Sequence, residues 1–194
     1  MAEPTQAAPT AGSPSDVLMA LYMGDRDKAI SLARNLTLTL PELAAFGDLA
    51  QVTRHLTRTT RDLHAYSADG WTALHLAAYF GYAAVVVRLM RAGASHAAIS
   101  HNVQGNTPLH AALAGRRELP VITALLAAGA DASTIDAQGY APLHLAAARG
   151  DQAVSELLLV CGADRTVRTR DGKVAADFAR EKDHTDLAAF LAVT

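Results

Sequence analysis

The sequence repeats one tetrapeptide three times, as Thr72-Ala73-Leu74-His75, Thr107-Pro108-Leu109-His110 and Ala141-Pro142-Leu143-His144. The three histidines lie 35 and 34 residues apart. A fixed period of this length indicates a repeat array, in which one supersecondary unit cannot bury its apolar face alone and stacks on its neighbours. Such an array usually works through an extended surface.

Two series of glycines recur in the sequence with the same period. A first series ends short polar segments and consists of Gly70, Gly105, Gly139 and Gly172. Glycine supplies the positive φ that a tight turn demands. A second series follows apolar helical segments and consists of Gly93, Gly129 and Gly162, where a glycine is expected to end a helix. Each unit is therefore predicted to hold a turn and two helices.

The composition favours an all-α array and excludes several classes. The 194 residues are 51% hydrophobic but only 5% aromatic, and alanine, a strong helix former, carries much of the apolar count. A net charge of −2 offers no basic field for nucleic acid. No run of 18 apolar residues predicts a membrane span, and residues 1–15 lack the features of a secretory signal, so we expect a cytoplasmic protein. Cys161 is the only cysteine, which excludes an intrachain disulfide and a cysteine-rich metal site.

The repeated residues resemble the ankyrin repeat. The pattern runs from Asp69 to Ala94 and recurs at 105–131 and 136–164, with many positions in register. The resemblance implies an all-α ankyrin-repeat solenoid of stacked helix-turn-helix units joined by β-hairpin-like loops, with a concave inner-helix face. It also implies binding of other proteins, because ankyrin repeats serve mainly as protein-binding modules.

The period divides the chain into about six helix pairs preceded by a tail. We expect a disordered tail at 1–15, followed at 16–66 by divergent helix pairs that cap the N-terminal end. Three repeats are expected at 67–101, 102–135 and 136–168. A capping repeat at 169–194 is expected to end the array. The stretch 57–66 has no clear Gly-Ala-Asp, so its hairpin is left open. The second repeat holds one extra residue, which we place in the loop at 115–118.

The repeated histidines His75, His110 and His144 are predicted to be structural. A metal site needs several ligands around one ion, whereas these histidines occur one per unit. A neutral imidazole can accept a hydrogen bond from the threonine or a hairpin amide and donate one to a carbonyl, which ties turn to helix. The unit with Ala141 in place of threonine is expected to lose one such bond, at about 1 kcal/mol.

No catalytic or cofactor motif is present, so we expect neither an enzyme nor a bound cofactor or metal. The sequence has no nucleophile elbow, no phosphate-binding loop and no His-Glu-x-x-His. Cys161 follows an apolar helix and is interpreted as a packing residue. Arg54, Arg58 and Arg61 are interpreted as a solvated helix face and not as a nucleic-acid site.

The candidate binding surface comes from the resemblance, residue by residue. Hairpin-tip positions give Asp69, Gln104 and Gln138 before the turn glycine and Trp71, Asn106, Tyr140 and Lys173 after it. Inner-helix positions give Tyr79, Phe80 and Arg149, and the extra loop gives Arg116 and Arg117. We expect the aromatic members to form one exposed contact patch, since exposed aromatic and arginine side chains dominate interface energetics. The alternative is that Tyr79 or Phe80 packs between units.

These observations predict a monomeric, non-catalytic module that recognises a partner protein through hairpin tips and inner-helix face. The main alternative is a structural or self-associating unit with its aromatic patch buried in a homodimer. An enzyme is the least favoured alternative.

Overall fold

A computed structural model describes residues 14–115 and 118–192, and within them every regular element is a helix. The helices are α1 (Pro14–Tyr22), α2 (Arg26–Ala33), α3 (Leu40–Phe46), α4 (Leu49–Arg58), α5 (Ala73–Tyr79), α6 (Ala83–Arg91), α7 (Pro108–Ala114), α8 (Leu119–Ala127), α9 (Pro142–Ala148), α10 (Gln152–Val160), α11 (Ala175–Glu181) and α12 (Thr185–Leu191). The predicted disordered tail at 1–15 lies almost wholly outside these described residues.

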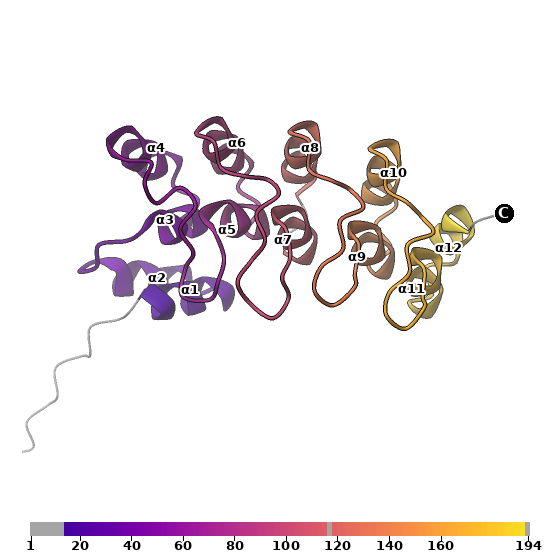
Figure 1. Cartoon of the computed structure of the whole chain (residues 1–194). Coiled ribbons are helices and arrows are strands. Elements are labelled where there is room, and N and C mark those ends of the chain that lie inside the picture. The colour runs from indigo at the N-terminus through magenta and orange to yellow at the C-terminus, as the bar shows by residue number, and fades with distance from the viewer. Residues whose placement is uncertain (1–13, 116–117, 193–194) are drawn as a thin grey trace, which may run out of the picture.

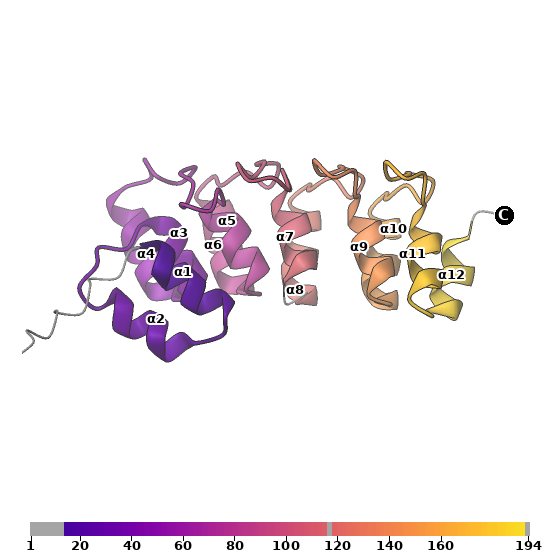
Figure 2. The ribbon, with the colours of Figure 1, turned by 90° about the horizontal axis from the view of Figure 1, so that it is seen from below.

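The helices form two parallel rows (Figure 1). The inner row holds α3, α5, α7, α9 and α11, and the outer row holds α4, α6, α8, α10 and α12. Hairpin-like loops connect successive pairs and project from one edge of the slab (Figure 2). The predicted all-α solenoid of stacked helix-turn-helix units is confirmed, and the pairs from α5 to α12 each fall within one expected unit.

The core lies between the two rows and is built from leucine and alanine. Leu74, Leu109 and Leu143, the leucines of the repeated tetrapeptide, are each at most 1% exposed. Buried alanines on the inner helices, such as Ala77 and Ala112, let neighbouring helices approach closely. The apolar sides of α6, α8 and α10 cover this layer from the outer row. No unit closes its core alone, as expected of a repeat array.

The connection at 57–66 lacks a clear Gly-Ala-Asp, yet it leads directly into a hairpin at 66–72 that turns at Gly70. The amide of Ser67 donates to the carbonyl of Trp71 at 2.8 Å, and Tyr66 and Thr72 form a β-bridge. Leu63 is buried and contacts the position of Gly93 in the next unit.

The first helix pair departs from the expectation that it caps the end of the stack. The pair α3–α4 stacks in line with the array, but α1–α2 lies across the inner helices (Figures 1 and 2). Val17, Leu18 and Leu21 of α1 pack in a second apolar cluster with Phe46 of α3 and with Phe80, which follows α5. The N-terminal end of the inner-helix face is therefore covered by the chain itself.

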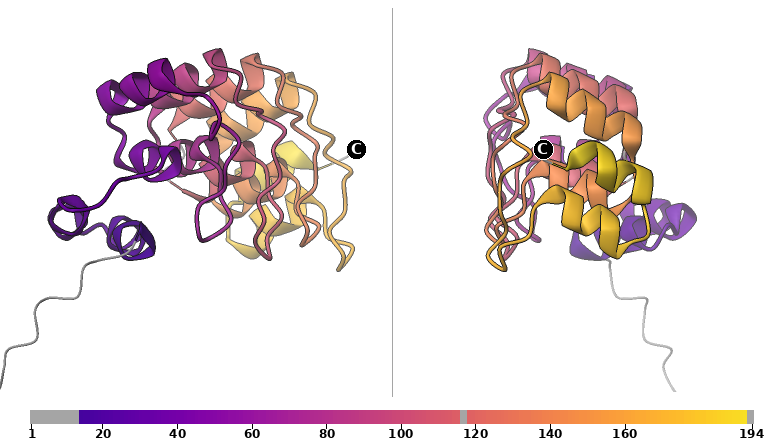
Figure 3. Two further views of the ribbon diagram at one scale, coloured as in Figure 1. Left: turned by 60° about the vertical axis from the view of Figure 1, so that its left-hand side comes forward. Right: turned by 90° about the vertical axis from the view of Figure 1, so that its right-hand side faces the viewer.

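The polar C-terminal unit closes the opposite end of the slab (Figure 3). Arg180, Glu181, Lys182 and Asp183 are all exposed there, as a terminal repeat requires. In the described part of the chain, no helix is long and apolar enough to cross a membrane.

One glycine marks the closest backbone approach between repeats. A Cβ on Gly115, which follows α7, would lie 1.9 Å from the carbonyl oxygen of Tyr79 in α5. Gly115→Ala is therefore expected to push two inner helices apart and to cost about 3 kcal/mol of unfolding free energy, as overpacked sites do. Urea unfolding measures this loss.

Gly24→Ala is the control for that substitution. Gly24 has φ +77° but its Cβ would meet nothing within 4 Å, so only the backbone strain of about 1 kcal/mol applies. A loss for Gly115→Ala no larger than that for Gly24→Ala would contradict the close-approach explanation.

Candidate functional site

His75 joins the start of its own helix to the next repeat. Its Nδ1 accepts from the amide of Thr72 at 3.4 Å and lies 2.8 Å from the Thr72 hydroxyl, while its Nε2 lies 2.9 Å from the carbonyl oxygen of Asn106. A carbonyl oxygen can only accept, so Nε2 carries the proton and Nδ1 is the acceptor. These are the hydrogen bonds expected of a neutral structural imidazole.

The two other histidines repeat this arrangement. Nε2 of His110 donates to the carbonyl of Tyr140, and Nε2 of His144 donates to the carbonyl of Val167, each at 3.0 Å. At Ala141 the hydroxyl contact is absent, as expected, but the Ala141 amide still donates to Nδ1 of His144 at 2.9 Å. The histidines thus connect successive repeats in a single direction along the array.

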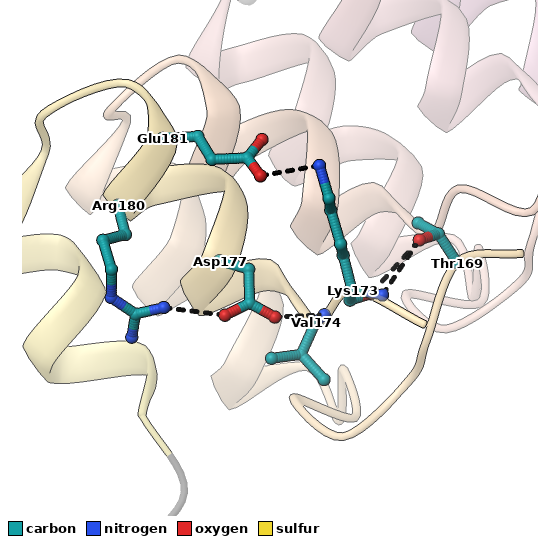
Figure 4. Close-up of polar contacts among 6 residues, drawn as sticks. All are labelled: Thr169, Lys173, Val174, Asp177, Arg180 and Glu181. Carbon is teal, nitrogen blue, oxygen red and sulfur yellow. Dashed lines mark hydrogen bonds and ion pairs between the residues drawn. The ribbon is translucent and has the colours of Figure 1, made fainter. Parts of the chain in front are cut away.

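Carboxylates take the place of histidine in the first and last stacked units. The Thr39 amide donates to Oε2 of Glu42 at 2.8 Å, and the Val174 amide donates to Oδ2 of Asp177 at 3.0 Å (Figure 4). Sequence reasoning did not assign this role to Glu42 or Asp177. Each is the third residue of its helix, where a carboxylate can accept a hydrogen bond from the amide that precedes the helix. That position is the sequence signal that could have predicted their role.

Burial keeps the histidines neutral. Desolvation lowers the pKa of His75 to about 4, and it also holds the pKa values of His110 and His144 below the ordinary histidine range. Among the described residues, no group of three or more His, Cys, Asp or Glu side chains is placed to hold a metal ion. Both nitrogens of each repeated imidazole already have partners within the fold.

The tip residues predicted after the turn glycine are not free contact residues. Trp71 and Asn106 are buried, so their assignment to an exposed surface was wrong. Tyr140 is half-buried with its ring against Phe178, and half-buried Lys173 forms a 2.6 Å ion pair with Glu181 (Figure 4). Their partners lie within the fold, as in the hydrogen bond between the Ser100 hydroxyl and Oδ1 of Asn106.

The expected aromatic patch is also internal. Phe80 is buried and Tyr79 half-buried, because Tyr22 of α1 stacks on Phe80 at 5.4 Å and meets Tyr79 edge-on at 5.5 Å between centroids. The prediction of an exposed patch was therefore wrong for these side chains. The alternative of packing between units is confirmed for Phe80, which clusters with Phe46 of the preceding unit and Ala111 of the following one. The contact with α1 is an addition that the sequence did not predict. Tyr140 lies apart, at the junction of α9 and α11.

One hydrogen bond holds α1 over this cluster. The Tyr22 hydroxyl donates to Oδ2 of Asp69 at 2.5 Å, and burial together with the Asp69 carboxylate raises the pKa of that phenol above its ordinary range. Asp69 is exposed as predicted, but its carboxylate also accepts from the Ser67 hydroxyl. Asp69 therefore links the N-terminal helix pair to the hairpin at 66–72 through a hydrogen bond.

The hairpins are linked to one another by hydrogen bonds. Backbone amides of His101 and Ala137 donate to the carbonyls of Gly70 and Gln104 at 2.8 and 2.9 Å. Side chains add parallel bonds, from Asn102 to the Asp69 carbonyl, from Gln138 to the Val103 carbonyl and from Arg170 to the Ala137 carbonyl. The edge formed by the hairpins is therefore a continuous, cross-linked surface.

Five predicted residues remain, of which three lie in the described part of the chain. Gln104 and Gln138 are exposed at the hairpin tips. Arg149 is exposed and donates to the carbonyls of Ala114 at 2.8 Å and Gly115 at 3.4 Å, so it also ties α9 to the end of α7. Arg116 and Arg117 lie outside the described residues.

Sequence reasoning missed a set of exposed apolar hairpin residues. This hairpin set consists of Tyr66 (37% exposed), Ile99 (45%), Val103 (79%) and Ile135 (55%). The repeated position of Tyr66, Ile99 and Ile135, just before the turn of successive hairpins, is the signal that could have identified three of them. Large apolar side chains held exposed on one edge are typical of a surface that another molecule covers.

The family is settled by comparison with known proteins. Residues 42–136 match a family model described as ankyrin repeats (3 copies), and residues 138–170 match the ankyrin repeat model. The chain belongs to the ankyrin repeat family. Ankyrin repeats are generally protein-binding modules.

Relatives that share this similarity are much longer proteins. Tyrosine-protein kinase Shark of Drosophila melanogaster is 37% identical over 134 residues, covering 68% of this chain and 14% of the kinase. The nuclear factor NF-kappa-B p105 subunit of Gallus gallus is 33% identical over 140 residues, covering 69% of this chain and 14% of that protein. RelA-associated inhibitor of Mus musculus is 38% identical over 95 residues, covering 47% of this chain and 11% of the inhibitor. This chain therefore matches only a small part of the length of each relative.

The burial of His75 makes stability depend on pH. The unfolded chain protonates this histidine near its ordinary pKa of 6.5, whereas the folded protein protonates it only at about 4. The unfolded state therefore binds more protons in this window, so the contribution is fully present above pH 6.5 and falls as the pH drops. At pH 4 the loss is about 3 kcal/mol from His75 alone, measured by urea unfolding at several pH values.

His75→Gln should reduce this pH dependence, because an amide can accept and donate without titrating in this range. The control His64→Gln makes the same substitution at an exposed position and leaves the buried His75 in place. Equal pH dependence in the two variants would show that burial of His75 does not contribute.

Proposed function

We propose that this ankyrin array is a non-catalytic module that binds a partner protein. Its contact surface would comprise the hairpin set and the inner-helix face over α7, α9 and α11, which α1 and α2 leave uncovered (Figure 2). The observation that carries the proposal is the exposure of Val103 and Ile135 on hairpins that hydrogen bonds hold in place. A preformed surface binds with a smaller loss of conformational entropy than a mobile one.

The polar chemistry of the repeats supports a non-catalytic role. His75 and His110 use both ring nitrogens within the fold, and their pKa values are lowered by burial. A general base needs a free nitrogen within reach of its substrate. These histidines therefore serve better as structural ties than as catalytic groups.

Two features favour a protein as the ligand. The hairpin set combines aliphatic side chains with exposed Gln104 and Gln138, a mixture of apolar and hydrogen-bonding groups found at protein interfaces. The name of the mouse relative records association of that protein with another protein, RelA. That name supports a protein partner in general terms and does not transfer RelA to this chain.

The test introduces charge into the hairpin set. The double variant Val103→Asp, Ile135→Asp is expected to weaken partner binding at least about tenfold, because each substitution removes an apolar contact and buries a carboxylate at the interface. Capture from native lysate, followed by titration of the captured protein, measures the effect. Unfolding midpoints should stay near the wild-type value, since both side chains are exposed.

Val160→Asp, Met23→Asp is the matched control. These side chains are 85% and 77% exposed and lie away from the hairpins, at the end of α10 and after α1. Equal binding by the two double variants would reject the hairpin set as the contact surface. A wild-type dimer that the hairpin variant converts to monomer in sedimentation would favour the self-associating alternative instead.

A further inference from the structure

A hollow of about 600 Å³ is lined by residues 26–58, which form the N-terminal part of the array. Its walls come from α2, the connection at 34–38, the end of α3 and one side of α4. Its volume is in the range of clefts that hold several side chains of a ligand. The resemblance to ankyrin repeats does not account for this hollow, because α1–α2 forms no part of the regular stack.

The rim of the hollow is cationic. Arg26 and Arg34 come from the start and the end of α2, and Arg54 and Arg58 lie one turn apart on α4. All four are exposed. Residues almost 30 positions apart in the sequence thus bring four guanidinium groups to one concave site.

This positive charge is offset only in part within the described residues, by the Asp48 carboxylate, which interacts electrostatically with Arg54. Asp48 is the single carboxylate among the lining side chains, and it begins α4 by accepting from the amide and side chain of Gln51 at 3.0 and 2.9 Å. In residues 14–115 and 118–192, Arg34, Arg54 and Arg58 form no ion pair. Four like charges gathered in one hollow repel one another, and an anionic ligand would relieve that repulsion.

One of the four arginines is already held in position. The Arg26 guanidinium donates to the carbonyl of Phe46 at 2.9 Å and to the Tyr82 hydroxyl at 3.3 Å, and it lies 5.8 Å from the centre of the Phe46 ring. These contacts come from α3 and from the start of α6. Arg26 therefore needs little reorganisation to present its remaining N–H groups.

The floor of the hollow is apolar. Leu43 and Phe46 are buried there, Leu36 and Leu38 are half-buried, and Ile30 is 43% exposed at the edge. An apolar floor beneath a cationic rim suits a ligand that carries both carboxylates and an aliphatic side chain. A guanidinium can pair with a carboxylate through two parallel hydrogen bonds, which gives the rim geometric selectivity as well as charge.

We propose that this arginine-rimmed hollow binds an acidic segment of a partner protein, with carboxylates on Arg34, Arg54 and Arg58 and an aliphatic side chain on the floor. A protein segment fits better than a nucleic acid because the whole chain has a net charge of −2 and offers no extended basic field. The apolar floor also has no counterpart in a phosphate backbone. This site is separate from the hairpin set and does not depend on the function proposed above.

The test uses a fluorescein-labelled octapeptide in which glutamate and leucine alternate. At low ionic strength it should bind saturably to the full chain, and added salt should weaken binding because the ion pairs are screened. Arg54→Ala, Arg58→Ala should weaken it at least about tenfold, since two charge-assisted contacts are lost. Fluorescence anisotropy measures the affinity, and matching unfolding midpoints establish that the variant is folded.

The control Arg88→Ala, Arg91→Ala makes the same change in net charge on α6, outside the hollow. It should change the affinity by less than about twofold, as should the hairpin variant Val103→Asp, Ile135→Asp. Ile30→Ser should weaken the glutamate–leucine peptide but not an all-glutamate octapeptide. The two arginine double variants together test whether the rim binds the carboxylates. The two peptides together test whether the floor binds the leucine side chains.

Three results would overturn the proposal. One is the absence of saturable peptide binding to the wild-type chain. Another is equal loss of affinity in the two arginine double variants, which would assign binding to the overall field and not to the hollow. The third is binding of an oligothymidine of equal charge as tight as that of the peptide, which would assign the site to polyanions in general. None of these results bears on the hairpin set, which the variants Val103→Asp, Ile135→Asp test separately.

Discussion

Each inner helix of the stack is only seven residues long, so most of its backbone amides and carbonyls lie at a helix end, where no intrahelical partner is available. The array depends on how these ends are satisfied. In every stacked unit the third residue of the helix accepts from the amide that precedes the helix, through Glu42, His75, His110, His144 or Asp177. Histidine adds a second bond that a carboxylate cannot make, because its Nε2 donates to a carbonyl of the following unit. The three histidines therefore hold the interior repeats together, and the carboxylates occupy the two terminal stacked units.

The same physical constraint shapes the surface. Loops that reach across to their neighbours through backbone and side-chain hydrogen bonds cannot reorient independently, so the apolar side chains they carry stay exposed at fixed spacing. Trp71 and Asn106 follow the turn glycine and are buried, and Oδ1 of Asn106 accepts a hydrogen bond from Ser100 of its own hairpin. The exposed residues Asp69 and Gln138, before the turn glycine, also make hydrogen bonds to other elements, so one set of residues both stabilises the stack and faces solvent.

Sequence periodicity was sufficient to predict the fold, because the same pattern of turn and helix residues occurs in three successive units. It also led to the hydrogen bonds of His75, since an imidazole three residues into a helix has few other partners. It failed for Phe80, whose exposure is decided by α1, a segment almost 60 residues earlier with no repeat register to reveal where it packs. The arginine-rimmed hollow was out of reach for the same reason. Arg54 and Arg58 could be placed on one helix face, but their proximity to Arg26 and Arg34 depends on the tertiary position of α2.

The covering of α3 and α5 by α1–α2 has a consequence for competition at the inner-helix face. The helix pair is joined to α3 by the short connection at 34–39, so its local concentration at that surface is set by the connection and not by the amount of protein. For a short tether this effective concentration is on the order of millimolar. A ligand directed at Phe46, Tyr79 or Phe80 would have to displace an intramolecular rival, whereas a ligand directed at α7, α9 and α11 meets none. The chain thereby divides one continuous row of helices into a shielded half and an accessible half.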